Sequence, residues 1–180
     1  MLSAALEADL PADCTQTIAE LCLAAGVKLP VYESRSAEAL EIALSILPIT
    51  EQDDRHWLVR GAAKGGSLEC FELALELSGL DLTGIDDIQF YAALGGNVDI
   101  MRRVLDSGVS LLDDGADFWE AVFSGSLELC RLLVSRGAFV HGNSRDLRRN
   151  TGVVELLGAH LPSLYQTSFR QLEVSRFEYV

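Results

Sequence analysis

A fixed spacing of glycines is the feature of this 180-residue sequence that most limits its fold. One set recurs at intervals of 30 and 29 residues and consists of Gly66, Gly96 and Gly125. A second set recurs at intervals of 29 residues and consists of Gly79, Gly108 and Gly137. A period of this length is typical of stacked supersecondary units and not of one globular core. Each unit is therefore predicted to contain a helix, a glycine turn, a second helix and a second glycine turn.

The second helix of each unit carries an apolar stripe at helical spacing. Asn97 and Ser126 stand where a side chain can accept a hydrogen bond from the first turn of such a helix. The stripe is expected to lie buried between neighbouring units, and its leading members are Leu68, Phe71, Val98, Met101, Leu127 and Leu133.

The repeat fades toward both ends of the sequence. The array is expected over residues 1–162, with its best units at 53–82, 83–111 and 112–140 and degenerate closing pairs at 11–50 and 141–162. Terminal repeats are expected to be atypical because one of their faces has no neighbour. The first closing pair is predicted to combine a helix over Asp13–Ala25 with a second one that Ser36 caps. Residues 163–180 match no unit and are expected to cap the stack or to form a tail.

The turn and stripe pattern, closest in Gly125–Ala138, resembles the ankyrin repeat. The resemblance implies an all-α helical solenoid of about five helix pairs whose loops form hairpin fingers. The Thr-Pro-Leu-His motif of the family is absent, and the period is some three residues below the usual ~33. The missing residues fall in the finger, so the fingers are expected to be short. Tetratricopeptide-like pairs, with a period of about 34 residues, are the second interpretation, and a non-repeating helical bundle is the third.

The charge of the chain favours some partners and opposes others. The net charge is −13, and residues 1–130 hold 23 acidic and 7 basic side chains. This surface repels nucleic acid and anionic membranes and favours a protein partner with a basic surface. No apolar run approaches the roughly 18 residues of a membrane span, and the acidic N-terminus is unlike a secretory signal. The four cysteines are Cys14, Cys22, Cys70 and Cys130. They lack CxxC spacing, which favours reduced thiols in the core and a location in the cytosol or nucleus.

Sequence motifs for catalysis, metals or cofactors are absent. The histidines do not have ligand spacing, the double glycines lack the context of a phosphate loop, and no serine stands in a nucleophile elbow. We therefore expect no metal, no cofactor and no catalytic residue. The alternative is a small-molecule enzyme on the same scaffold, with a pocket lined by carboxylates such as Asp87 or Asp117.

Paired aspartates precede the three best units' first helices, and the pairs are Asp53-Asp54, Asp86-Asp87 and Asp113-Asp114. One aspartate at each place is explained by helix capping. The second is surplus and would stack with its counterparts into an acidic ladder along one edge. A binding surface and a row of caps are the two interpretations of this ladder.

The ankyrin resemblance also implies a concave face, formed by positions that flank the small residues of each first helix: Gly61, Lys64, Tyr91, Leu94, Glu120 and Phe123. Tyr91, Leu94 and Phe123 are expected to form an exposed apolar spot, as in a binding hot spot, unless the helices rotate and bury them. Phe90 and Trp119 fall at positions that the family buries.

These patterns predict a protein-binding module that acts as an inhibitor or an adaptor, and leave its oligomeric state open. The predicted binding residues are Asp54, Asp86, Asp87, Tyr91, Leu94, Asp113, Asp114, Asp117, Glu120 and Phe123.

Overall fold

The computed structural model describes residues 12–24, 35–46 and 52–138, which form eight α-helices, one 3₁₀ helix and no strand. The all-α class is thus confirmed for the described residues. The α-helices are α2 (Ala12–Ala24), α3 (Ala37–Ile46), α4 (Gln52–Gly65), α5 (Leu68–Ser78), α6 (Ile88–Gly95), α7 (Val98–Asp106), α8 (Ala116–Ser124) and α9 (Leu127–Ser135). The expected closing pair at 141–162 and the segment 163–180 lie outside the described residues.

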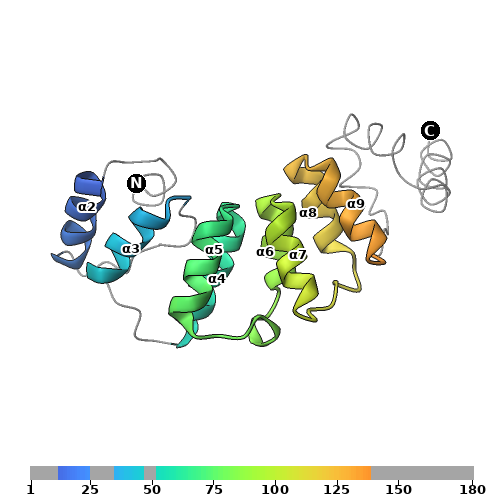
Figure 1. Cartoon of the computed structure of the whole chain (residues 1–180), viewed down its shortest axis with the longest axis horizontal. Coiled ribbons are helices and arrows are strands. Elements are labelled where there is room, and N and C mark those ends of the chain that lie inside the picture. Colours follow the sequence, from blue (N-terminus) through green and yellow to red (C-terminus); the bar gives the residue numbers. More distant parts are fainter. Residues whose placement is uncertain (1–11, 25–34, 47–51, 139–180) are drawn as a thin grey trace, which may run out of the picture.

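The helices form a row of pairs in chain order (Figure 1). In the three pairs from Gln52 onward, α4 packs on α5, α6 on α7, and α8 on α9. The first helices α4, α6 and α8 pack on one another extensively, whereas the second helices α5, α7 and α9 touch one another less. The layer of first helices is therefore the more tightly packed of the two.

Small residues allow this close packing of the first helices. Ala62 and Ala63 of α4 and Ala92 and Ala93 of α6 are all buried, and the two helices pack on each other. A Cβ at Gly95 would overlap the carbonyl oxygen of Ala63, so only glycine fits that position without movement of the backbone. The spacing of α4 and α6 is thus set by contact between backbone atoms.

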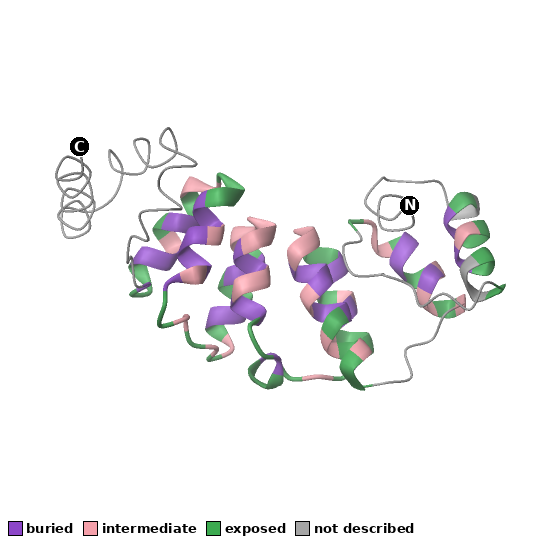
Figure 2. Cartoon of the chain, turned by 180° about the vertical axis from the view of Figure 1, so that it is seen from behind, coloured by how far each residue is buried: buried purple, intermediate pink, exposed green. Residues whose placement is uncertain are grey.

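The second helices bury most of the apolar stripe, but the first stripe residue of each helix is exposed or only partly buried. Phe71, Met101 and Leu133 are fully buried, as expected. The prediction was wrong for Leu68, which is 38% exposed, and Val98 and Leu127 are only partly buried. These three residues begin their helices beside the glycine turn, where neighbouring pairs cover them incompletely. Ile100 and Leu129, one half-turn further on, have no exposed surface, and Figure 2 shows the buried residues along the inward faces.

Polar side chains cap the second helices as predicted. The backbone N–H of Ile100 donates to Asn97 Oδ1 at 3.2 Å, and that of Leu129 donates to Ser126 Oγ at 3.4 Å. Ser36 caps α3 in the same way, accepting from the N–H of Ala39 at 3.3 Å. Asn97 also donates from Nδ2 to the carbonyl of Gly66 at 2.8 Å, which ties α7 to the turn of the preceding pair.

The loop between α5 and α6 contains a 3₁₀ helix, η2 (Leu82–Gly84), where the sequence resemblance implies a hairpin finger. Asp81 caps it by accepting from the N–H of Thr83 at 3.1 Å. Leu82 and Ile85 are buried in the core. The loop therefore folds back onto the helices instead of projecting from them.

The cysteines depart in one case from the expected core positions. Cys70 and Cys130 are buried, but Cys14 is exposed on α2, so the expectation of a core thiol was wrong there. Burial raises the pKa of the Cys130 thiol to about 11, which opposes reaction as a thiolate. The side chain of Cys22 lies outside the described residues. Among the described helices, none has the length and apolar character to cross a membrane.

Replacing Gly95 by alanine should destabilise the protein, although alanine favours helix by about 1 kcal/mol over glycine. The added methyl group would force α4 and α6 apart, and such overpacking costs roughly 1–3 kcal/mol. Urea unfolding of the variant measures the change. Ser124→Ala is the matched control, because Ser124 is the equivalent residue of α8 and already carries a Cβ. A variant as stable as the wild type would contradict the close contact.

Candidate functional site

The paired aspartates stand at the same end of three neighbouring helices. Asp53 and Asp54 occupy the first turn of α4, Asp86 and Asp87 precede α6, and α4, α6 and α8 lie side by side. Asp113 and Asp114 precede α8 and are exposed, as are Asp53, Asp86 and Asp87, while Asp54 is half-buried. This arrangement concentrates negative charge at the loop end of the first helices.

Asp87 is held in an unusual backbone conformation. Its φ of 58° is positive, and it is the one non-glycine residue of the described part with that property. It occupies the N-cap position of α6, yet its carboxylate makes no capping hydrogen bond. In α8 the N-cap position has the same conformation but is filled by Gly115, with φ 71°. A side chain at this position strains the backbone, and the carboxylate of Asp87 does not offset the strain by capping.

Asp114 and Asp117 hold the loop that leads into α8. Asp114 Oδ1 accepts from the N–H of Ala116 at 3.0 Å. Asp117 is fully buried, and its two oxygens accept from the N–H of Leu112 at 2.9 Å and from its neighbour Phe118 at 2.8 Å. Asp117 thus lies inside the loop and not on a surface that a partner could touch, contrary to its place in the predicted binding set.

A cluster of two aromatic rings and an arginine connects α4 with α6. The guanidinium carbon of Arg60 lies 5.2 Å from the ring centre of Trp57 and 5.7 Å from that of Tyr91. The two rings meet edge to face with centres 6.3 Å apart. Arg60 Nε donates to the backbone carbonyl of Asp86 at 2.8 Å. Cation–π attraction and this hydrogen bond together hold the guanidinium in place, and Trp57 is 44% exposed beside it.

The other predicted contact residues lie nearer the glycine turns. Leu94 is half-buried near the end of α6, and Phe123, its equivalent in α8, is 39% exposed. Tyr91 and Glu120 are half-buried one turn earlier in the two helices. The apolar residues therefore extend along the first helices, with only Tyr91 close to the aspartates. Of the two predicted core replacements, Trp119 is buried and Phe90 is half-buried.

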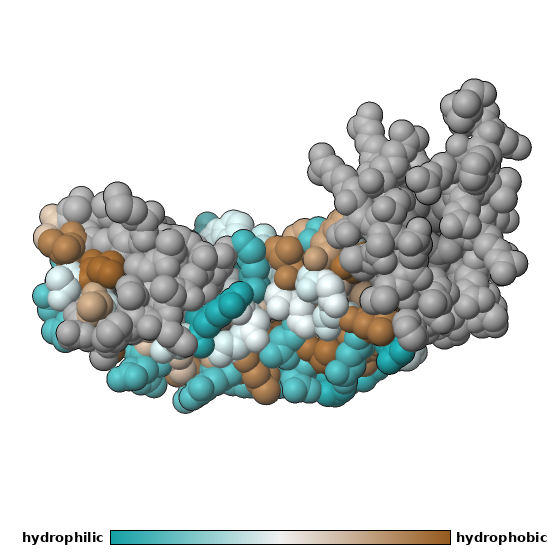
Figure 3. Space-filling model, turned by 90° about the horizontal axis from the view of Figure 1, so that it is seen from above, coloured by the Kyte–Doolittle hydropathy of each residue, from teal (hydrophilic) through white to brown (hydrophobic). Residues whose placement is uncertain are grey.

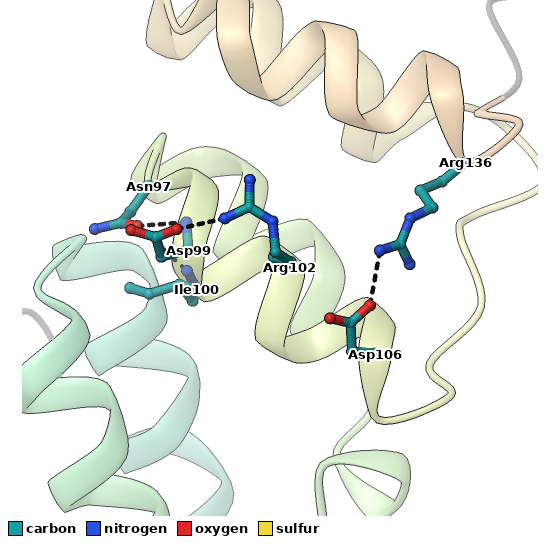
Figure 4. A network of polar contacts seen from close by, with 6 residues as sticks. All are labelled: Asn97, Asp99, Ile100, Arg102, Asp106 and Arg136. Carbon is teal, nitrogen blue, oxygen red and sulfur yellow. Dashed lines mark hydrogen bonds and ion pairs between the residues drawn. The ribbon is translucent and has the colours of Figure 1, made fainter.

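Ion pairs join the second helices. Arg103 Nε lies 3.2 Å from Glu72 of α5, and Arg136, the residue after α9, lies 2.7 Å from Asp106 of α7. Arg102 pairs with Asp99 within α7 at 2.6 Å. Figure 4 shows the last two pairs beside the Asn97 cap. From above, the described surface mixes hydrophilic and apolar side chains along its length (Figure 3). Arg102, Arg103 and Arg136 are thus each paired with a carboxylate of the second-helix layer.

The described residues offer no group of three or more histidine, cysteine, aspartate or glutamate side chains that could hold a metal ion. Sequence reasoning missed two residues that the structure adds to the site, Trp57 and Arg60. They lie opposite Tyr91 because α4 packs on α6. In the sequence, their position in the first helix of the preceding unit is the one feature that indicates this contact.

Asp87→Gly should stabilise the protein by roughly 0.5–1 kcal/mol, because glycine adopts positive φ without strain. The free energy of unfolding in urea measures this gain. Asp86→Gly is the control, since Asp86 has an ordinary backbone conformation and glycine there should only add unfolded-state entropy. Destabilisation by both changes would show that the Asp87 side chain contributes to the fold.

The stability of the protein should carry a pH dependence from Asp117. Burial raises the pKa of its carboxyl; the hydrogen bonds from Leu112 and Phe118 oppose the rise, and the charge of Asp114 adds to it. Because the folded form holds this proton more tightly than the unfolded form, the contribution of Asp117 falls as pH rises through the interval between the two pKa values. Asp117→Asn lacks this contribution. The stability of the variant relative to the wild type, measured in urea melts, should therefore improve as pH rises above the ordinary carboxyl pKa of 3.8. A decline would mean that the hydrogen bonds outweigh burial.

No protein-family model matches the chain, and no curated protein or solved structure is significantly similar to it.

Proposed function

We propose that this chain is a divergent, short-fingered ankyrin-type solenoid that binds a protein with a basic surface, as its inhibitor or adaptor. The proposal rests mainly on one observation: the exposed Trp57 and the half-buried Tyr91 and Arg60 lie directly beside the exposed Asp86 and Asp87. Tryptophan, tyrosine and arginine are the residue types that dominate binding energy at protein interfaces.

The family assignment is supported by the agreement between sequence period and helix pairs. Glycines with positive φ follow the first helices, Gly66 at 75°, Gly96 at 72° and Gly125 at 78°. They also follow the second helices, at Gly79, Gly108 and Gly137. Such a double turn in every unit favours the ankyrin type over tetratricopeptide-like pairs, in which glycine is not expected at both turns.

The distribution of charge supports a basic partner. Exposed carboxylates gather at the loop end of the first helices. In the second-helix layer, by contrast, Arg102, Arg103 and Arg136 pair with carboxylates of that same layer. A negative edge of this kind speeds encounter with a positive surface. The half-exposed apolar residues Tyr91, Leu94 and Phe123 would supply the desolvated contact once the partner has docked.

The positions of Asp87 and Asp117 do not favour the alternative function, a small-molecule enzyme with a pocket lined by carboxylates. Asp117 is buried with both oxygens bonded to backbone N–H groups, so it is a loop-stabilising residue. Asp87 is exposed at the surface in front of α6. A catalytic pair needs carboxylates that face a common substrate, and these two have different environments.

The partner can be sought by photo-crosslinking. A photoreactive phenylalanine analogue at Tyr91 or Phe123 should capture the partner, whereas the same analogue at Leu77 should not. Leu77 is the matched control because it is 52% exposed on the second helix α5. Capture of the same proteins from all three positions would contradict a binding face on the first helices.

Binding kinetics with the captured partner should separate charge from contact. Asp87→Asn and Asp114→Asn should slow association and flatten its dependence on ionic strength, because exposed charges act mainly on encounter. Tyr91→Ala or Phe123→Ala should speed dissociation, at a cost of about 1–3 kcal/mol for a hot-spot residue. Surface plasmon resonance at several salt concentrations measures both effects.

Glu72→Gln and Arg103→Gln are the controls for these kinetics, since both side chains lie on the second helices and pair with each other. They should leave both rate constants nearly unchanged. If they abolish binding while the first-helix variants bind normally, the proposed face is wrong.

A further inference from the structure

The Arg60 side chain is held in place by the fold, but only one of its N–H donors has a hydrogen bond to the described residues of this chain. Its Nε–H donates to the carbonyl of Asp86, and its guanidinium carbon lies within 6 Å of the ring centres of Trp57 and Tyr91. A guanidinium has five N–H donors, four of them on the two terminal nitrogens. Within the described part of the chain, no carboxylate forms an ion pair with these nitrogens.

This situation contrasts with that of the arginines on the second-helix side. Arg102, Arg103 and Arg136 each pair with a carboxylate of this chain. Arg60 lies next to Asp86 and Asp87, yet it bonds to a backbone carbonyl and not to either side chain. The hydrogen bond at Nε leaves the two terminal nitrogens as an end-on fork, which matches the two oxygens of a carboxylate.

We propose that Trp57, Arg60 and Tyr91 form a carboxylate-binding site that receives an aspartate or glutamate side chain of the protein partner. The two rings restrict the guanidinium before binding, so little side-chain entropy remains to be lost when the carboxylate docks. Trp57 extends an exposed apolar surface beside the fork, which lowers the local dielectric around the ion pair.

The carboxylate-binding site and the neighbouring acidic edge together limit which protein partners can bind. The exposed carboxylates of Asp86 and Asp87 repel an anion that comes alone, so the acidic side chain must arrive among basic residues that pair with the edge. The partner motif is therefore an acidic residue flanked by lysine or arginine. This inference rests on the proposed function, since it assigns the partner's chemistry at the same face.

Three short peptides test the site on the whole 180-residue chain: Ac-Lys-Glu-Lys-NH₂, its Gln counterpart Ac-Lys-Gln-Lys-NH₂, and Ac-Lys-Gln-Lys with a free carboxyl end. Binding is followed by NMR titration of the Arg60 side-chain N–H and the Trp57 indole N–H. The Glu peptide should bind about 3- to 10-fold more tightly than the Gln peptide, as expected for a charge-assisted pair that is partly screened by solvent.

Variants show whether Arg60 is the cause of the preference. Arg60→Gln should reduce the Glu-to-Gln affinity ratio to about 1, and Arg60→Lys should reduce it too, because lysine keeps the charge but lacks the planar fork. Arg103→Gln is the matched control and should keep the wild-type ratio. Thermal melts by circular dichroism confirm that each variant is folded.

Several results would overturn the site: equal affinity for the Glu and Gln peptides, an unchanged ratio in Arg60→Gln, or no detectable binding of the Glu peptide. Tighter binding of only the peptide with the free carboxyl end would show that the site binds a chain terminus and would overturn its assignment to an acidic side chain. If all peptides bind equally and Asp87→Asn weakens them all, the carboxylate site fails while the acidic binding face remains supported.

Discussion

Contact between the backbones of α4 and α6 is the constraint on which the rest of this arrangement depends. Gly95 lies so close to the carbonyl of Ala63 that no Cβ fits between them. This contact fixes the distance between two helices whose residues are about 30 positions apart in the sequence. Because that distance is short, Tyr91 of α6 reaches both Trp57 and Arg60 of α4. The candidate site is therefore a consequence of small residues in the core and not of a local motif.

The two layers of helices use their charges in different ways. In the second helices, charged side chains pair across neighbouring units, as Glu72 does with Arg103. These pairs are exposed and each contributes on the order of 0–1 kcal/mol, so their main effect is to neutralise charge locally. At the loop end of the first helices, Asp86 and Asp87 are exposed. The carboxylates of Asp86 and Asp87 thus contribute negative charge to the edge beside the aromatic cluster.

The sequence predicted the helices and their caps because these depend on neighbours in the chain. A stripe at helical spacing and a serine or asparagine before it suffice for α7 and α9. The stripe wrongly predicted that Leu68 is buried, because the exposure of the first residue of a helix depends on how far the next helix pair covers it. The Trp57–Arg60–Tyr91 cluster was missed for a similar reason. Arg60 aligns with Phe90 and Trp119, and nothing in that alignment shows that the guanidinium reaches across to the following unit.

The loop aspartates show why composition alone does not assign function. Asp114 caps the start of α8, Asp117 holds the same loop from inside, and Asp87 does neither at the start of α6. A row of caps explains Asp114 but not Asp87, whose backbone is strained where the next unit has glycine. Residues kept in a costly conformation without a stabilising contact are concentrated at functional sites. The strain at Asp87, directly beside the carbonyl that accepts from Arg60, therefore supports the proposal that the binding face is centred on α4 and α6 and not on the turn before α8.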